Sequence, residues 1–348
     1  MKKALFRILF LLPLASFCLF PSPEGYGQER VLIKFAALAP EGSTWMKHMR
    51  RLESNLKKMS GGVLVFRIYP GGIAGDELDV LRKIRIGQIH CAAFSGVGFG
   101  QILPMVRVLD LPFLFRSHEE VDLVHRQLED FFREEFRKAD FELLSWAEVG
   151  NVHLFSRKPI RRVADLSGLK IWTWTGDPIS QATFSSMGVT PIPLSVTDVT
   201  TALNTGMIDT VYAPPLGALA LQWHRYTKCM SAMPLAHSTG AVLFSGSYFR
   251  KIPPELARML RDAFQGAMQD LTLDLRRQTK EAVRMIEQSG LQILPMPTQE
   301  DLEDFYRIHD QVAGHLVGKV YSRDILDRVY AVLAKKRDSD RPPREKKP

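Results

Sequence analysis

The sequence predicts an α/β protein built from two similar lobes. Three observations support this fold class: strands and helices alternate from residue 31 onward, the alternation returns in the second half, and one helical pattern covers residues 254–289. Strands that alternate with helices run parallel, because each helix carries the chain back across the sheet. A chain of 348 residues also exceeds what one core comfortably holds, which favours two lobes.

Residues 31–94 predict a β-α-β-α-β unit. The apolar run 31–37 predicts the first strand, and Ser43 is the expected N-cap of the helix after it. Gly61 and Gly62 end that helix, and its apolar residues follow one face at spacings of three and four. These apolar residues are Trp45, Met49, Leu52, Leu56 and Met59. A strand, a helix and a strand are then expected over 63–69, 76–86 and 88–94.

The second half repeats this order. Its elements are expected over 169–173, 177–187, 190–193 and 208–213. Asp177 is the expected N-cap of the first helix, directly before a proline. Ser195 with Asp198 resembles a capping box that opens a second helix, which ends at Gly206. The second half therefore predicts another parallel α/β lobe.

Residues 254–289 carry an uninterrupted helical stripe, with proline only at the first position. At ~1.5 Å per residue, such a helix extends for roughly 54 Å, longer than either lobe. It must lie across both lobes unless Gly266 breaks it.

The first 27 residues are typical of a secretory signal. A positively charged start precedes the apolar run 9–20, which is too short to span a bilayer, and 25–27 form a small-x-small cleavage site. Cys18 leaves lipid attachment as an alternative, which the large Phe17 before it disfavours. We expect an exported, periplasmic protein from which the signal is removed.

The basic charge is concentrated at the two ends. Of the formal net charge of +8, segment 1–27 supplies three basic residues and one acidic, and the tail 335–348 supplies seven basic and three acidic. The body between them therefore carries only +2, which argues against nucleic-acid binding. The Pro- and Lys-rich tail is expected to be a disordered, solvated end, with contact to anionic lipid as the alternative.

No motif nominates an enzyme, a cofactor or a metal. The sequence contains no His-Glu-x-x-His, Gly-x-Ser-x-Gly or Walker pattern, and its nine histidines lack ligand spacing. The glycine-rich segment 96–100 misses the dinucleotide fingerprint and is expected to be a flexible turn near a cleft. Cys91 and Cys229 lie in apolar surroundings and are expected to be buried thiols, although a disulfide stays open.

Several short strings carry a family resemblance. They cover residues 60–62, 69–72, 75–77, 86–89, 110–115, 165–170 and 205–209. In this order they resemble the solute-binding proteins of TRAP transporters, the DctP family, over nearly the whole mature chain. The resemblance implies a two-lobed periplasmic-binding-protein fold (type II-like) with a long helix spanning both lobes. It also implies a receptor, not an enzyme, that closes around a solute and delivers it to the membrane subunits of a TRAP transporter.

The sequence departs from the family at three polar anchors. The resemblance implies an arginine after Gly-Leu-Lys-Ile for the ligand carboxylate, and Trp172 stands there. A second arginine is implied two residues after Gly150, where the sequence has Val152. Ala213 replaces an asparagine that the resemblance implies before a proline. All three replacements are apolar.

These departures predict a largely apolar or aromatic ligand. A carboxylate beside an apolar ring would lack the charge-assisted hydrogen bonds that contribute about 1.5–3 kcal/mol each. A tryptophan instead offers roughly 150–250 Å² of apolar contact. The predicted ligand-binding residues are Trp172, Val152, Ala213, Tyr212, Trp174, Pro214, Trp223 and Phe99.

Other interpretations of the tryptophans stay open. Trp172 and Trp174 alternate onto one face of a strand, and that face could be core. Trp223 could instead cap a helix at the surface. The alternative function is a periplasmic carrier of hydrophobic molecules or lipids that serves an envelope complex without a TRAP permease.

The lobes are expected to exchange chain at crossovers near Gly150 and His237. The first lobe would then hold residues 28–150 and about 238–270, and the second 151–237 and about 271–334. The expected partners are a small-molecule ligand and the transporter subunits, with membrane contact only through the transporter.

Overall fold

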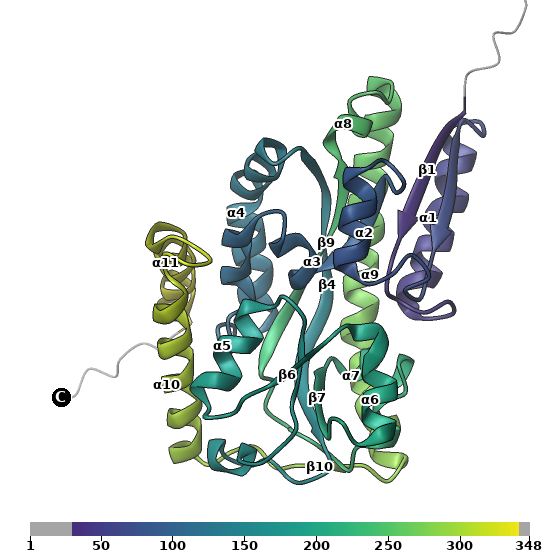
Figure 1. Cartoon of the computed structure of the whole chain (residues 1–348). Coiled ribbons are helices and arrows are strands. Elements are labelled where there is room, and N and C mark those ends of the chain that lie inside the picture. Colours follow the sequence, from purple (N-terminus) through teal and green to yellow (C-terminus); the bar gives the residue numbers. More distant parts are fainter. Residues whose placement is uncertain (1–29, 341–348) are drawn as a thin grey trace, which may run out of the picture.

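The computed structural model describes residues 30–340. The predicted signal 1–27 and residues 341–348 of the basic tail lie outside the described residues. The N-terminal unit alternates strands and helices as the sequence predicts (Figure 1). Its elements are β1 (Val31–Ala36), α1 (Thr44–Met59), β2 (Leu64–Tyr69), α2 (Glu77–Arg85) and β3 (Cys91–Ser95). β1 pairs in parallel with both β2 and β3, which confirms the parallel arrangement of this unit.

Side-chain caps fix where these helices begin. The Ser43 hydroxyl accepts a hydrogen bond from the Met46 amide at 3.3 Å, so α1 begins where the sequence predicts. Asp76 caps α2 in a reciprocal capping box with Asp79. The apolar stripe of α1 is mostly buried, although Met59 at its end is exposed.

Two long antiparallel strands join the halves of the molecule. β4 (Phe141–Ser156) and β9 (Ala236–Ser245) pair along most of their length, and β9 continues the N-terminal sheet beside β3. A register shift falls between Glu148 and Gly150, and Gly150 has a φ of +115° that favours glycine. The expected crossovers at Gly150 and His237 therefore lie side by side in one strand pair.

The second half is built on shorter strands. Its strands are β5 (Trp172–Trp174), β6 (Ile192–Leu194), β7 (Thr210–Ala213), β8 (Cys229–Met230) and β10 (Gln292–Ile293). β5 and β6 are parallel, whereas β7 and β8 pair antiparallel with β4. Its short helices are α5 (Pro178–Ser186), α6 (Val199–Thr205) and α7 (Pro215–Ala220), with the 3₁₀ turns η2 (Val163–Leu166), η3 (Val196–Asp198) and η4 (Trp223–Tyr226). The second half therefore has the predicted alternation of strands and helices, but its strand pairs are both parallel and antiparallel.

The capping box at Ser195 is a correction. The turn η3 separates Ser195 from α6, and the Ser195 hydroxyl donates a hydrogen bond to Asp76 in the other half of the molecule. The Asp198 amide, which a capping box would direct to the Ser195 hydroxyl, donates to the Ser195 carbonyl at 3.0 Å. The predicted end of α6 is confirmed, because Gly206 adopts the left-handed conformation there.

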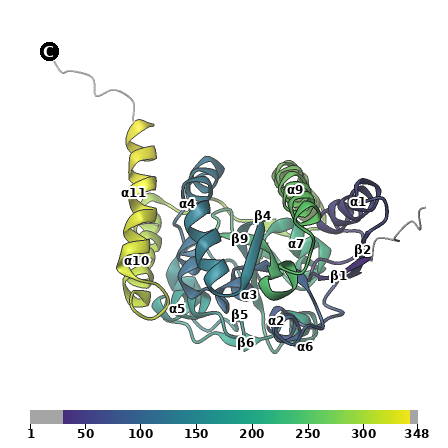
Figure 2. The same ribbon diagram turned by 90° about the horizontal axis from the view of Figure 1, so that it is seen from above.

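The long helix is confirmed. α9 (Pro254–Gln288) runs through Gly266 without a break and packs against β4, α1 and α7. Figure 2 shows α9 and α4 (His118–Lys138) on the same side of the molecule, and both pack on β4. α9 therefore contacts elements from both halves of the chain.

Two C-terminal helices complete the fold. α10 (Gln299–Leu316) packs against α5, and α11 (Arg323–Ser339) packs against α4 and the 3₁₀ segment η1 (Pro104–Asp110). α11 includes residues 335–339, so the helix extends into the segment for which the sequence favours disorder. Within residues 30–340, no helix combines the length and the apolar character needed to cross a bilayer.

The glycine-rich segment differs from its prediction. Residues 96–100 form the short helix α3 (Gly96–Gly100), which Ser95 caps, and another short helix, α8 (Gly246–Phe249), follows β9. A Cβ atom added at Gly96 or Gly100 would collide with Arg107, and one at Gly98 with Phe94. The glycines therefore permit close packing against neighbouring side chains. Among the described residues, Cys91 and Cys229 are free, buried thiols.

Candidate functional site

A cavity of about 770 Å³ lies between the two halves of the molecule. Its walls come from α1, α3 and the β3 region on one side and from β5, α5, β7 and α7 on the other. Seven of the predicted residues line it: Trp172, Val152, Ala213, Tyr212, Trp174, Pro214 and Trp223. A cavity of this size suits a small-molecule ligand. The fold therefore brings together, around one cavity, seven predicted residues that are far apart along the chain.

Phe99 is a correction. Its side chain lies outside the lining of the cavity and is fully buried, with its ring edge-on to Phe136 and Trp146 at centroid distances of 6.5 and 6.4 Å. Residues 96–100 form a helix in place of the expected turn, and this directs Phe99 into the core.

Four aromatic side chains form one wall of the cavity. Trp172 stacks on Tyr212 with a centroid distance of 4.8 Å and an interplanar angle of 21°. Trp223 meets Trp172 edge-on at 5.3 Å, and Trp174 lies 6.0 Å from Trp172. Trp172 and Trp223 are each only 2% exposed, so most of each ring packs against protein. Trp172 therefore serves the core as well as the cavity.

The polar edges of these indoles bond to the protein. The Nε1 of Trp172 donates to the Leu194 carbonyl at 3.1 Å, and that of Trp223 donates to the Thr200 hydroxyl at 3.1 Å. The Nε1 of Trp174 donates to the Asp76 carboxylate at 2.9 Å. Because the N–H groups are already paired, what the rings offer to the cavity is carbon.

The buried guanidinium on the cavity wall is doubly paired. Arg107 lies 3.0 Å from an Asp110 oxygen and 2.5 Å from an Asp177 oxygen, and all three side chains are less than one tenth exposed. Burial raises the pKa of Asp110 to about 6, against the lowering effect of Arg107. Two acidic partners therefore compensate the charge of Arg107. Asp177 is the predicted N-cap of α5, but pairing with Arg107 is a second role that the sequence did not reveal.

Asp76 links the two halves across the cavity. Its Oδ1 accepts from the Glu77 amide at 2.6 Å. Its Oδ2 accepts three further hydrogen bonds, all from the second half: from Trp174 Nε1, the Ser195 hydroxyl and the Val196 amide, at 2.9, 2.5 and 3.2 Å. Asp76 thus connects the two walls directly.

Glu77 lies on the cavity wall beneath α3. Its carboxylate accepts from the Ser95 amide at 2.7 Å, the Ser95 hydroxyl at 2.9 Å and the Gly98 amide at 2.7 Å. Burial raises the pKa of Glu77 from 4.5 to about 7, although these hydrogen bonds oppose the rise. The folded protein therefore holds this proton more tightly than the unfolded chain.

The raised pKa of Glu77 makes stability depend on pH. The stabilisation from the bound proton is complete below pH 4.5 and is lost as the pH rises through about 7. Relative to Glu77→Gln, which cannot ionise, we expect the wild type to lose about 3 kcal/mol of unfolding free energy between pH 4.5 and 8. Urea unfolding at several pH values measures this difference, with the exposed Glu255→Gln as control. Parallel pH profiles for wild type and Glu77→Gln would refute the prediction.

Sequence reasoning missed the polar residues of the site. The string 75–77, which contains Asp76 and Glu77, contributed to the family resemblance but indicated no partner for either side chain. Arg107 stands in a segment without a motif, and its partner Asp177 lies 70 positions away. The structure also gathers His118, Glu148 and His237, although the sequence predicts no metal ligands. The signal available for Asp76 was its expected position at the start of a helix, which does not reveal a partner in the other half.

Comparison with known proteins identifies the family. Residues 35–317 match the family model "Bacterial extracellular solute-binding protein, family 7", DctP. The 2,3-diketo-L-gulonate-binding periplasmic protein of Escherichia coli is 26% identical over 227 residues, which are 63% of this chain and 67% of that protein. The sialic acid-binding periplasmic protein of Vibrio cholerae is 22% identical over 279 residues, 78% of this chain and 84% of that protein.

The fold agrees with a solved structure. The sugar acid binding protein from Advenella mimigardefordensis, in complex with galactonate, superposes with a TM-score of 0.83. The match covers 88% of this chain and 99% of that chain at 17% identity. The family match extends over most of the sequence, and the superposition includes nearly the whole of the solved protein. The chain therefore belongs to the DctP family of TRAP-transporter solute-binding proteins, which bind solutes and are not enzymes.

Proposed function

We propose that this protein is a periplasmic receptor that binds a largely apolar or aromatic solute in the 770 Å³ cavity and delivers it to TRAP membrane subunits. The subunits are the partner that the family implies, and the proposal includes export through removal of segment 1–27. The ligand class is a departure from the relatives, which include a sialic acid-binding protein and a sugar acid binding protein in complex with galactonate.

The main support for an apolar or aromatic solute is that Arg107 is already paired with two aspartates. Among the described residues that line the cavity, Lys47 and Arg107 are the only lysine and arginine, and Lys47 is exposed. Arg107 already faces two aspartates, so a solute carboxylate near it would meet an excess of negative charge. Trp172, at the position where the family resemblance implies an arginine, offers only carbon.

The aromatic wall supports the same class. A ring that packs against this wall, beside Trp174 and the accessible edge of Trp172, would bury apolar area at about 25 cal/mol per Å². Offset or edge-on contact between rings contributes about 0.5–1.5 kcal/mol beyond that area. A charged carboxylate at the same place would lose its hydration without gaining a donor. Apolar burial, ring contact and the cost of dehydrating a carboxylate therefore all favour a neutral aromatic solute over an acid.

The proposal includes lobes with the predicted boundaries, 28–150 with about 238–270, and 151–237 with about 271–334. The bonds of Asp76 and the Arg107–Asp177 pair would then cross the cleft and stabilise the form in which the lobes touch. The contact of α11 with α4 would join the C-terminal helices to the first lobe as well.

Two measurements test the ligand class. Native mass spectrometry of the purified full chain is expected to reveal a neutral or aromatic solute carried from the cell. In calorimetry, indole-3-acetamide is expected to bind at least tenfold more tightly than indole-3-acetate, which differs mainly by its charge. Succinate and D-glucuronate serve as acid controls. Tighter binding of these acids than of the amide would overturn the proposal.

A further inference from the structure

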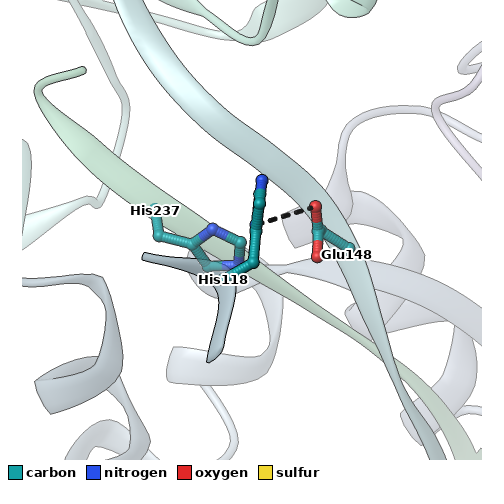
Figure 3. Close-up of side chains that lie close together, drawn as sticks. All are labelled: His118, Glu148 and His237. Atoms are coloured by element: carbon teal, nitrogen blue, oxygen red, sulfur yellow. Dashed lines mark ion pairs between the residues drawn. The ribbon is translucent and has the colours of Figure 1, made fainter. Parts of the chain in front are cut away.

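Three side chains converge beside the strand pair that joins the two halves (Figure 3). His118 is the first residue of α4, Glu148 lies on β4 next to the register shift, and His237 lies on β9. One ligand atom from each lies within 4.8 Å of the others. Among the described residues, His118 Nδ1 and His237 Nε2 are buried ring nitrogens that lack a hydrogen-bond partner. The cluster therefore contains two unused donors of the kind that metals bind.

A second residue orients His237. Its Nδ1 lies 3.0 Å from the side-chain oxygen of Asn151, which can only accept, so Nδ1 carries the proton. The lone pair is then on Nε2, the nitrogen that faces His118 and Glu148. An outer-shell acceptor that fixes the tautomer is the usual companion of a metal-binding histidine.

Glu148 presents one oxygen to the histidines. Its Oε2 is paired with Arg276 at 2.7 Å, while its Oε1 lies 3.9 Å from His118 Nδ1. Arg276 also forms a two-pronged pair with Asp122, at 2.6 and 2.8 Å. The neighbouring His125 stacks on Trp146, and burial lowers its pKa to about 4, so it adds no charge at neutral pH. The carboxylates of Glu148 and Asp122 and the guanidinium of Arg276 together leave a net charge of −1, which favours binding of a cation.

We propose that His118, Glu148 and His237 form a binding site for a divalent transition-metal ion of the Zn²⁺ class. Two imidazole nitrogens and one carboxylate oxygen are ligands that Zn²⁺ prefers, and three protein ligands leave a fourth position open. Bonds of about 2.0–2.1 Å require ligand atoms about 3.4 Å apart in a tetrahedron. The His118 side chain is 38% exposed and can rotate to make this approach.

An ion at this site would hold together the elements where the two halves of the molecule join. It would connect α4, β4 and β9 directly beside Gly150, where the two halves of the molecule join. His237 also lines the 770 Å³ cavity, so the ion would lie at the cavity edge. The site is independent of the proposed solute class, because none of its three ligands belongs to the aromatic wall.

Calorimetry with ZnCl₂ tests the site in the full chain, without an affinity tag and after dialysis against a chelator. The wild type is expected to bind one ion per chain at micromolar or lower concentration, with a rise in melting temperature. His118→Ala and Glu148→Gln are expected to weaken binding more than tenfold. Asn151→Ala, which removes the support of His237, is expected to weaken it about tenfold.

The exposed helical His315→Ala is the matched control and should bind like the wild type. His118→Ala is the decisive variant, because its partly exposed side chain can be removed without disturbing the core. If folded wild-type protein binds no Zn²⁺, or if His118→Ala and His315→Ala bind it equally well, the proposal is wrong.

Discussion

Replacing Asp177 by alanine should separate the two halves of the protein. The change leaves the guanidinium of Arg107 buried with Asp110 as its one remaining acidic partner. Breaking a buried pair by removing one partner costs about 3–5 kcal/mol. Because Asp177 is the N-cap of α5 and Arg107 lies on η1, opening the cleft would return the guanidinium to water. We therefore expect a larger radius of gyration in solution scattering.

Two further variants separate the ion pair from helix capping. Asp177 also accepts a hydrogen bond from the Ile179 amide at 3.0 Å, and loss of a cap alone costs about 1 kcal/mol. Asp177→Asn keeps a good cap but removes the charge, so it should open the cleft nearly as much as alanine. Asp198→Ala is the control, since Asp198 precedes α6 without a side-chain cap bond and is exposed. Compact scattering from Asp177→Asn would show that only the cap matters.

The elements that the sequence predicted well are those whose bounds are fixed by residues close together in the chain. Ser43 begins α1 because its hydroxyl reaches an amide three residues away, and Gly206 ends α6 because it adopts a conformation that other residues avoid. The long helix α9 follows from an apolar stripe without an internal proline. These signals lie within a few residues of one another, so a single sequence contains them in full.

The polar residues of the cavity depend on distant partners. Arg107 and Asp177 are 70 positions apart, and Asp76 and Ser195 are 119 apart. Neither pair has a spacing that a helix or a turn would bring together, and each forms only when the two halves pack. His118, Glu148 and His237 similarly come from α4, β4 and β9, and their approach depends on how α4 packs against the strands. Phe99 was wrongly predicted to line the cavity, because residues 96–100 form a helix that packs closely against Arg107 and directs Phe99 into the core.

Trp172→Ala should have the largest effect on both stability and solute affinity. The ring is 2% exposed and contacts Tyr212 and Trp223, and removal of a buried tryptophan costs about 3–5 kcal/mol of unfolding free energy. The same change removes part of the cavity wall. We expect the affinity for indole-3-acetamide to fall about tenfold or more, measured by calorimetry at a temperature where the variant stays folded.

A loss of stability could itself weaken binding, and Trp146→Ala controls for this. Trp146 packs against Phe99 and Phe132 and lies outside the cavity lining, so its removal should lower stability without a direct loss of solute contact. Trp172→Phe should recover part of the affinity, because a smaller ring can still stack on Tyr212. If Trp146→Ala weakens binding as much as Trp172→Ala does, the Trp172 indole acts through the core alone. A greater loss for Trp172→Ala at equal stability would place that indole in contact with the solute.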